Sequence, residues 1–393
     1  MVKNKTLFVL VLVLLVNALS YGTIIPLLYP YASRFGIGPI GLSWLFASFS
    51  IAQFIATPII GRLSDKYGRK PLLLICLLGT SISLALFASA QSVLMLFVAR
   101  ILDGITGGNN SVAQAIIADS TTGPERAKAF GLLGAAFGFG FLLGPALGGI
   151  LSQFGLTVPF WFASGLALLG TILGQVILKE TLPPQKVKIN NKPLFNFKSL
   201  YEALFAPLTG IILAISFLAT LALQTFVLGF QTFTVDILRL STTQIGFLFA
   251  AFGMAQIIMQ AVGLRLLLAN ISSKKKILLG SLGLCVMAMF LMALTSSFLP
   301  FVATFVIYMF SSAPQLPILS ALLSERTKAE DQGGVMGIQQ SYISLGQIAG
   351  PLLGGAIAAI SIHGVFFAAG VMFVFGIIAT QWLREPERHR FDL

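Results

Sequence analysis

AIIADSTTGPERAKAFGLLGAAFGFGFLLGPALGG, residues 115–149, aligns without a gap on ALLSERTKAEDQGGVMGIQQSYISLGQIAGPLLGG, residues 321–355, so that each position pairs with the one 206 residues later. The two stretches share five glycines and a proline at identical spacing, namely Gly131, Gly140, Gly144, Pro145, Gly148 and Gly149 with Gly337, Gly346, Gly350, Pro351, Gly354 and Gly355. Chance rarely repeats so many glycines at fixed spacing, and we infer that the chain consists of two halves of common design.

The composition is that of a protein embedded in a lipid bilayer. Of the 393 residues, 56% are hydrophobic and only 10% carry a charge, whereas roughly 25% are charged in an ordinary soluble domain. The mean hydropathy is +0.93. A bilayer core about 30 Å thick needs about 20 helical residues per crossing, which leaves room for about a dozen spans.

Twelve apolar runs separate the charged segments. They cover residues 7–28, 41–60, 71–90, 93–118, 129–151, 158–178, 205–230, 244–268, 277–293, 299–323, 334–360 and 364–383. With the N-terminus inside, cytoplasmic segments hold 22 of the 25 Lys and Arg residues, which fixes the orientation by the positive-inside rule. The bases are scattered between runs, so the net charge of +12 does not indicate a nucleic-acid partner. We expect a multi-pass protein of a bacterial inner membrane with both termini cytoplasmic.

The longest polar connector follows the sixth run and reads KETLPPQKVKINNKPLFNFKSLYE from residue 179 to 202. It predicts an N-terminal six-helix bundle at 1–178, a cytoplasmic linker at 179–203 and a C-terminal six-helix bundle at 204–393. Parallel repeats about an axis normal to the membrane, with a substrate site between the halves near the midplane, are typical of transporters. The expected fold class is an all-α integral membrane protein with twelve transmembrane helices in two pseudo-symmetric bundles.

The fourth run, 93–118, carries the one arginine predicted to lie within the membrane. At 100° per residue, Arg100, Asp103, Gly107, Asn110 and Gln114 fall within an arc of about 80°. Arg100 and Asp103 stand three positions apart and can pair, which lowers the cost of a charge at membrane depth. An ionisable residue within the membrane indicates a functional site, although a static structural pair gives the same pattern.

The fifth run presents a face of small residues. Gly140, Gly144 and Gly148 recur every four residues, so that a neighbouring helix can approach closely. Pro145 removes one backbone hydrogen bond and bends the helix. These residues predict a hinge helix, and plain helix packing is the alternative.

The turn after the second run, GRLSDKYGRK at 61–70, places one acid among four bases. Its Gly61, Asp65, Gly68, Arg69 and Lys70 resemble the signature loop of the major facilitator superfamily, whose pattern is Gly-x-x-x-Asp-x-x-Gly-Arg-Arg/Lys. In that family the loop is understood as a conformational latch between the two halves.

The resemblance gives the loop a set of expected contacts. The two glycines permit a tight turn and close helix approach. Asp65 is expected to face the start of the eleventh run, and Arg69 to reach Asp119 at the cytoplasmic end of the fourth. The second-half counterpart, LLANISSKKK at 267–276, keeps its bases but lacks the glycines and the acid, which predicts a one-sided latch. An ordinary cytoplasmic loop whose bases obey the topology is the alternative.

The resemblance becomes narrower in the fourth run. ARILDGITGG (99–108), followed by IIADSTTGPERAKAFG (116–131), is similar to the fourth span and following loop of the tetracycline efflux proteins, in the drug:proton antiporter branch of the superfamily. The glycine pattern of the fifth run is likewise that of exporting, antiporting members. The resemblance implies that Arg100 serves proton coupling, and Asp103, the one acid deep in a span, is our candidate proton carrier. Tetracycline exporters also carry acids in spans 1 and 9, where this chain offers Asn17 and no acid around Gly283.

Amides supply most of the remaining polarity within the spans. Together with Arg100, the substrate-binding candidates are Asn17, Gln53, Asn110, Gln114, Gln224, Gln231, Gln256, Gln260 and Gln339. Gln256 and Gln260 stand one turn apart, and Gln224 and Gln231 two turns apart, so each pair is expected to face a central cavity. With 34 phenylalanines in the chain, we expect an aromatic, apolar pocket suited to amphipathic molecules. For each glutamine, a hydrogen bond between helices is the alternative.

The sequence therefore predicts a secondary active transporter that exports a small amphipathic organic solute or drug in exchange for a proton, by alternating access. A proton-independent facilitator or an importer of a metabolite is the second interpretation, and a lipid enzyme or a channel is a third. An enzyme would gather His, Asp, Glu or Cys, yet the two histidines, His363 and His389, lie in an external turn and the C-terminal tail. We expect no catalytic residue, no cofactor and no metal, and a monomer whose partners are the solute, the proton and the bilayer.

Overall fold

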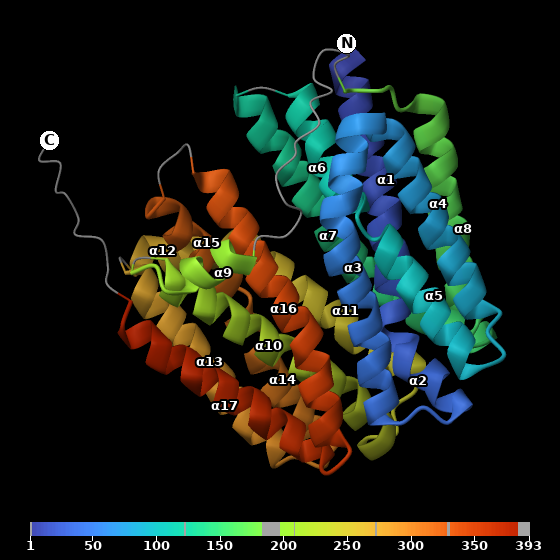
Figure 1. Cartoon of the computed structure of the whole chain (residues 1–393). Coiled ribbons are helices and arrows are strands. Elements are labelled where there is room, and N and C mark those ends of the chain that lie inside the picture. Colours follow the sequence, from blue (N-terminus) through green and yellow to red (C-terminus); the bar gives the residue numbers. More distant parts are fainter. Residues whose placement is uncertain are drawn as a thin grey trace, which may run out of the picture. The chain divides into compact units, whose positions relative to one another are not determined.

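The computed structural model describes residues 2–121, 123–182, 197–207, 209–271, 273–327 and 331–383, and within these ranges every regular element is a helix (Figure 1). The middle of the predicted linker, residues 183–196, lies outside the described residues, as do residues 384–393. The predicted all-α fold class is confirmed.

The helices follow one another along the chain with short connections. Up to residue 182 they are α1 (Val2–Ile24), α2 (Leu28–Ala32), α3 (Pro39–Tyr67), α4 (Arg69–Ala88), α5 (Val93–Thr106), α6 (Asn109–Ser120), α7 (Gly123–Leu151) and α8 (Val158–Ile177). From residue 197 they are α9 (Phe197–Leu204), α10 (Gly210–Thr232), α11 (Thr242–Ile258), α12 (Leu264–Asn270), α13 (Lys274–Ala293), α14 (Phe298–Ser312), α15 (Gln315–Glu325), α16 (Gln332–Ala358) and α17 (Ile362–Gln381). Three 3-10 turns, η1 (Ile25–Leu27), η2 (Ser33–Phe35) and η3 (Ser152–Phe154), and two π-helical turns, η5 (Phe233–Ile237) and η6 (Met259–Gly263), continue these helices.

Ten helical segments of the described chain are long and apolar enough to cross a membrane. They match ten of the twelve predicted spans, and the α5–α6 pair and α16 occupy the other two. Some segments run past the predicted limits, since those matching the first, second and seventh predicted spans reach Phe35, Tyr67 and Ile237. Hydropathy marks only the apolar part of a helix, whereas its backbone hydrogen bonds continue into more polar residues.

Two spans are interrupted at equivalent positions. Gly107–Gly108 separates α5 from α6, and 206 positions later Ala313–Pro314 separates α14 from α15. Paired glycines weaken a helix because they lose the most backbone entropy, and proline lacks the N–H that a helix interior needs. The repeat seen in the sequence is therefore also present in the backbone.

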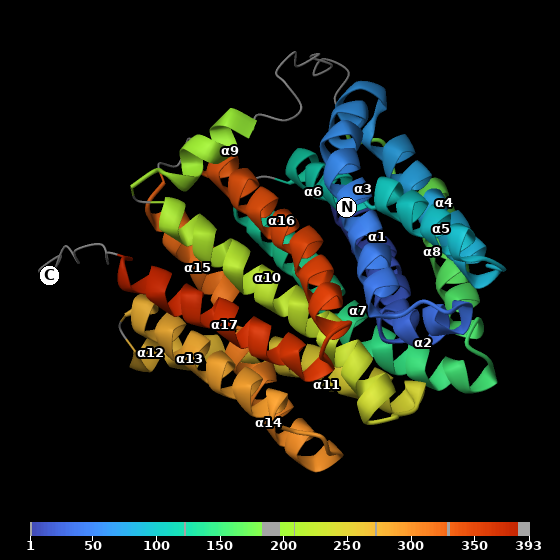
Figure 2. The ribbon, with the colours of Figure 1, turned by 60° about the horizontal axis from the view of Figure 1, so that its bottom comes forward.

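By their contacts the helices form two compact units, residues 1–195 with 230–254, and residues 196–229 with 255–393. In the first unit α1 packs along α7 and α8, α4 along α5 and α8, and α3 along α5 (Figure 1). In the second unit α13 packs along α14 and α17, and α16 along α17 (Figure 2). Residues 230–254 thus pack with the first unit although they follow the linker. The division into bundles at 1–178 and 204–393 stays a prediction.

The glycine face of α7 packs directly on α1. A Cβ atom built on Gly144 would lie 2.8 Å from Cα of Gly22, and Cβ atoms on Gly140 and Gly148 would meet the backbone of Ala18 and Thr23. The predicted close approach at this face is confirmed as packing. In the second unit the equivalent glycines of α16 pack on α10 in the same way, because Cβ atoms on Gly346, Gly350 and Gly354 would meet Thr220, Leu221, Gln224 and Thr225.

Candidate functional site

The centre of the candidate site is an ion pair inside the first unit. Nη1 of Arg100 lies 2.9 Å from Oδ2 of Asp103, three positions along α5, and the two side chains are only 5% and 7% exposed. The guanidinium carbon of Arg100 also lies 4.2 Å from the centroid of the Phe49 ring on α3. The predicted pairing is present, and the pair is buried among helices instead of facing the surface of the unit.

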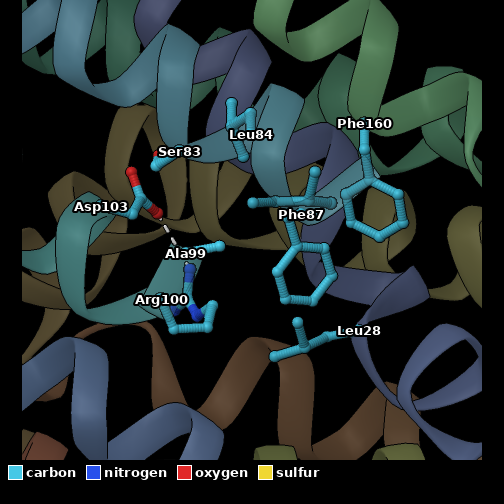
Figure 3. Close-up of a pocket in the computed structure, with 9 residues that line it drawn as sticks. Leu28, Ser83, Leu84, Phe87, Ala99, Arg100, Asp103 and Phe160 are labelled. Atoms are coloured by element: carbon cyan, nitrogen blue, oxygen red, sulfur yellow. Dashed lines mark hydrogen bonds and ion pairs between the residues drawn. The ribbon is translucent and has the colours of Figure 1, made fainter. Parts of the chain in front are cut away.

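Polar groups of α4 complete the surroundings of the acid. Ser83 and Thr80 lie near the carboxylate of Asp103, and Figure 3 shows Ser83 beside it. The Ser83 hydroxyl itself donates to the carbonyl oxygen of Thr80 at 2.8 Å. Nε of Arg100, in contrast, is buried and has no hydrogen-bond partner among the described residues. The carboxylate is therefore paired with Arg100, whereas Nε of that guanidinium is left without an acceptor among the described residues.

The polar face predicted along the fourth span does not continue past the pair. Because Gly107–Gly108 ends α5, the 100° rotation assumed from Arg100 to Gln114 does not hold across the break. Asn110 is half-buried with a buried Oδ1 that lacks a partner in the described structure, and Gln114 is exposed. The predicted single stripe is wrong at this point, since a double glycine interrupts the helix.

Two glutamines predicted to bind substrate make hydrogen bonds at the helix breaks in this structure. Nε2 of Gln53, on α3, donates to the carbonyl oxygen of Gly107 at 3.1 Å. In the second unit, Nε2 of Gln256 donates to the carbonyl oxygen of Met309 at 3.3 Å and to Oγ of Ser312 at 3.1 Å. Carbonyl groups at a helix end lose their intrahelical donor, so a buried amide from a neighbouring helix stabilises the break.

The other amides have separate surroundings. Gln231 is fully buried in the first unit and accepts a hydrogen bond from the backbone N–H of Tyr29 at 3.2 Å. Gln339 joins two serines of the second unit, donating to Ser216 and accepting from Ser320, both at 3.1 Å. Asn17 is buried on α1, Gln224 is half-buried on α10, and Gln260 is exposed in the π-helical turn η6.

Gln256 and Gln260 lie one turn apart on a helix that becomes π-helical at Met259, and Gln224 and Gln231 lie two turns apart on α10. That each pair faces a central cavity stays a prediction. Gln224 and Gln231 belong to different units by their contacts. A role in substrate binding stays a prediction for each of these residues.

Arg69 makes three of the side-chain contacts of the predicted latch. Its Nε lies 3.0 Å from Oδ2 of Asp119, its Nη1 lies 2.5 Å from Oδ1 of Asp65, and the same Nη1 donates to Oγ of Ser64 at 2.7 Å. The expected contact with Asp119 is present. Lys70 donates from Nζ to the carbonyl oxygen of Gln175 at 2.7 Å. These contacts join α3, α4, α6 and α8 at one end of the first unit, which we call the linker end.

Gly61 and Gly68 do not share one role. Gly68 alone connects α3 to α4, and its φ of +107° is a conformation that L side chains rarely adopt. Gly61, in contrast, lies inside α3, where an added Cβ would meet nothing within 4 Å. The expectation that Gly61 serves a tight turn or a close approach is wrong, because α3 continues through Tyr67.

Glu180 completes this end and was missed by the sequence analysis. Its carboxylate accepts backbone hydrogen bonds from Arg69 and Lys70 at 3.0 and 3.1 Å, and from Thr181 and Leu182 at 2.8 Å each. Burial alone would raise the pKa of Glu180, but the four backbone donors outweigh it and lower the pKa from its usual value. The carboxylate thus caps the N-terminus of α4, where the helix dipole also favours a negative charge.

The second unit holds a counterpart of these contacts. Lys274 forms an ion pair with Glu325, which lies 206 positions after Asp119. Nζ of Lys275 donates to the carbonyl oxygen of Gln381 at 2.8 Å, 206 positions after Gln175. The second half therefore keeps the base-to-acid and base-to-carbonyl contacts although it lacks the motif itself. The prediction that the second half lacks the latch therefore holds for the two glycines and Asp65, but not for the contacts that the bases make.

The opposite end of the first unit, which we call the far end, carries contacts that the sequence did not indicate. Oη of Tyr29 donates to Oδ2 of Asp236 at 2.6 Å. The hydroxyls of Ser152 and Thr242 lie 2.5 Å apart, and Thr243 donates to the carbonyl oxygen of Gly149 at 2.8 Å. Residues 230–254 are thus held against α2 and the end of α7 by side-chain hydrogen bonds.

Two repeated helical halves within a bilayer form the architecture of many secondary membrane transporters. The sequence model of the Major Facilitator Superfamily matches residues 10–268 and 212–392. The chain belongs to the major facilitator superfamily, a family of membrane transporters for small molecules, and it is a multi-pass membrane protein.

Relatives cover nearly the whole chain. Multidrug resistance protein 2 of Bacillus subtilis (strain 168) is 30% identical over 98% of this chain and 97% of its own length. Tetracycline resistance protein, class C, of Escherichia coli is 30% identical over 92% of this chain and 91% of its own. The predicted resemblance to tetracycline-efflux-type exporters is confirmed.

Solved structures support the fold. A bacterial homolog of the human lysosomal transporter Spinster, inward-facing and unoccupied, superposes with a TM-score of 0.80 at 15% identity, over 97% of this chain and 98% of that one. The human organic anion transporter MFSD10 (TETRAN) gives a TM-score of 0.73 at 24% identity, over 96% and 99%. The predicted major facilitator fold is confirmed.

Proposed function

We propose that this protein is a proton-coupled exporter of small amphipathic organic solutes that works by alternating access. The buried Arg100–Asp103 pair carries the proposal, together with relatives named for multidrug and tetracycline resistance. An ion pair at membrane depth is costly, and such residues mark proton or substrate pathways in membrane proteins. Transport, without catalysis on a lipid or any other substrate, is the whole of the activity we assign.

Asp103 is the proton carrier in this proposal, and Arg100 is its charge partner. While Asp103 is ionised, the pair is neutral, and the side chains of Ser83 and Thr80 lie near the carboxylate. When a proton binds, Arg100 keeps its charge but loses its counter-ion, and only Phe49 remains as a weak cation–π partner. An unpaired buried charge is unfavourable, so protonation shifts the equilibrium toward a conformation that solvates or re-pairs Arg100.

The two ends of the first unit supply the conformational contacts. At the linker end, Arg69 joins Asp65 and Asp119 while Glu180 holds the start of α4. At the far end, Tyr29 holds Asp236. Both sets of contacts are present together in this structure, and we propose that one set opens at a time as access changes sides, with α7 and its Pro145 as the hinge.

The orientation follows from the charges of the sequence. We propose cytoplasmic termini, so that the linker end faces the cytoplasm and the far end faces outward, in a bacterial inner membrane. We also propose that the transporter acts as a monomer of two bundles, 1–178 and 204–393, joined by the linker 179–203. The substrate contacts are proposed among the predicted amides and Arg100.

The proposal is tested by transport in proteoliposomes of purified protein. We expect a tetracycline or a fluorescent dye to accumulate when a pH gradient, acidic inside, is imposed across the vesicle membrane, and Asp103→Asn to abolish this response. A Glu202→Gln variant, changed at an exposed acid far from the pair in sequence, serves as the control. Solute flux that ignores the pH gradient in the wild-type protein would indicate a facilitator and refute the proposal.

A further inference from the structure

A small cavity, about 10 Å³ as counted by the centres of a water-sized sphere, lies inside the first unit, beside the ion pair (Figure 3). Five elements surround it, because α4, α5 and α8 contribute residues together with the end of α1 and the start of α2. Leu28, Leu84, Phe87 and Phe160 form much of its apolar wall. A cavity needs about 10–15 Å³ by this measure to hold one water molecule, so this one fits about a single water and no organic solute.

The polar part of the wall calls for a hydrogen-bonding occupant. Arg100, Asp103 and Ser83 all line the cavity. Arg100 is only 4% exposed, and its Nε has no hydrogen-bond partner among the described residues. A buried donor without an acceptor costs about 1–3 kcal/mol, and a water molecule in a cavity is stable when about two to four polar groups can bond it.

The cavity reaches toward the far end of the unit. Phe87 is one residue from the end of α4, Phe160 is two residues into α8, and Leu28 follows η1. Beyond Phe87 and Phe160 stands Tyr31, whose ring centroid lies 5.4 and 4.9 Å from theirs. Oη of Tyr31 donates to the carbonyl oxygens of Phe87 and Ala88, at 3.1 and 3.3 Å. A buried aromatic cluster therefore closes the cavity at the far end.

We propose that this cavity is a water site that passes protons from the far end of the first unit to Asp103, with Tyr31, Phe87 and Phe160 as its closure. The inference rests on the proposed proton coupling and adds a route inside one unit, separate from the route of the solute. A proton relayed by the water ends on a carboxylate oxygen of Asp103, and the water is left neutral. Besides Tyr31, Tyr21 is a titratable group that interacts electrostatically with both members of the pair.

Hydroxyl-radical footprinting with mass spectrometry tests the water directly, since radicals formed from bound water oxidise the side chains next to it. In the purified full-length protein, we expect Phe87 and Phe160 to be oxidised at least about threefold faster than Phe301 and Phe373, which are equally buried in the second unit. Equal rates would show a dry cavity and overturn the proposal without any variant.

Filling the cavity tests the route. Ala99 lines the cavity, so Ala99→Leu is expected to bring Phe87 and Phe160 down to the oxidation rate of the buried controls and to slow pH-driven solute transport several-fold. Ala135→Leu adds the same side chain at an exposed position of α7 and should change neither. Unchanged transport with a dry cavity in Ala99→Leu would overturn the route but leave proton coupling intact. Loss of coupling in the wild-type protein, in contrast, refutes the proposed function and leaves the footprint unaffected.

Discussion

Removing either member of the Arg100–Asp103 pair should destabilise the protein far more than removing both. Each side chain is at most 7% exposed, so a partner left alone keeps a charge that water does not solvate. Breaking a buried pair by deleting one partner costs about 3–5 kcal/mol, whereas replacing both partners by apolar groups is often neutral. We therefore expect Arg100→Leu and Asp103→Leu each to lower the free energy of unfolding by about 3–5 kcal/mol, and the double variant to lose less than about 1 kcal/mol.

The assay is denaturant unfolding of the purified protein in mixed micelles, followed for wild type, the two single variants and the double variant. The double-mutant cycle then gives the coupling free energy of the pair. Asp103→Asn is an intermediate case, because the amide still accepts a hydrogen bond, and it should lose about 1–2 kcal/mol. If the two single losses simply add in the double variant, the pair contributes no coupling and the reasoning is refuted.

Three further changes test the helix contacts. Gly144→Val should overpack α7 against α1 and cost about 1–3 kcal/mol of unfolding free energy, measured in the same micelles. The lowered pKa of Glu180 means that its stabilisation is present above the unfolded-state pKa of 4.5 and is lost as pH falls through the lower folded-state pKa, so Glu180→Gln should lose about 0.5–1 kcal/mol at neutral pH and little in acid. Tyr29→Phe removes the hydroxyl that bonds Asp236 at the far end. Because this loosens the far end, the reporter substitution Ser152→Cys should then react faster with a water-soluble thiol reagent.

Matched controls separate these effects from general damage. Gly134→Val lies on the same helix as Gly144, but an added Cβ there meets nothing within 4 Å, and it should cost less. Glu202→Gln removes an exposed carboxylate whose nearest base is 3.7 Å away. Tyr67→Phe removes a hydroxyl from a side chain that is 60% exposed. A control that matches its test variant would contradict the corresponding explanation.

The fold was predictable because its signals are local or periodic. Apolar runs of about 20 residues mark spans without any knowledge of tertiary contacts, and the 206-residue offset revealed the two halves. The same offset relates the breaks at Gly107–Gly108 and Ala313–Pro314. The Arg100–Asp103 pair was predictable for a similar reason, since a spacing of three residues on a helix brings two side chains together.

The contacts that were missed join residues distant in the chain. Glu180 caps a helix that begins 111 positions earlier at Arg69, and Asp236 lies 207 positions after its partner Tyr29. No periodicity connects such residues, and an acid at the end of a span resembles any other charge near the membrane surface. The hydrogen bond of Gln53 to Gly107 was missed for a similar reason, because its acceptor is a carbonyl freed by a helix break that hydropathy does not show.

The central claim is that Asp103 exchanges its proton when solute binds. It is tested most directly by counting protons released into weakly buffered micelle solution, as a ligand chosen by thermal stabilisation is titrated into the purified protein. We predict release of close to one proton per bound ligand from the wild-type protein at a pH where Asp103 is protonated, and none from Asp103→Asn, which should still bind the ligand. Equal release from both proteins would contradict the account.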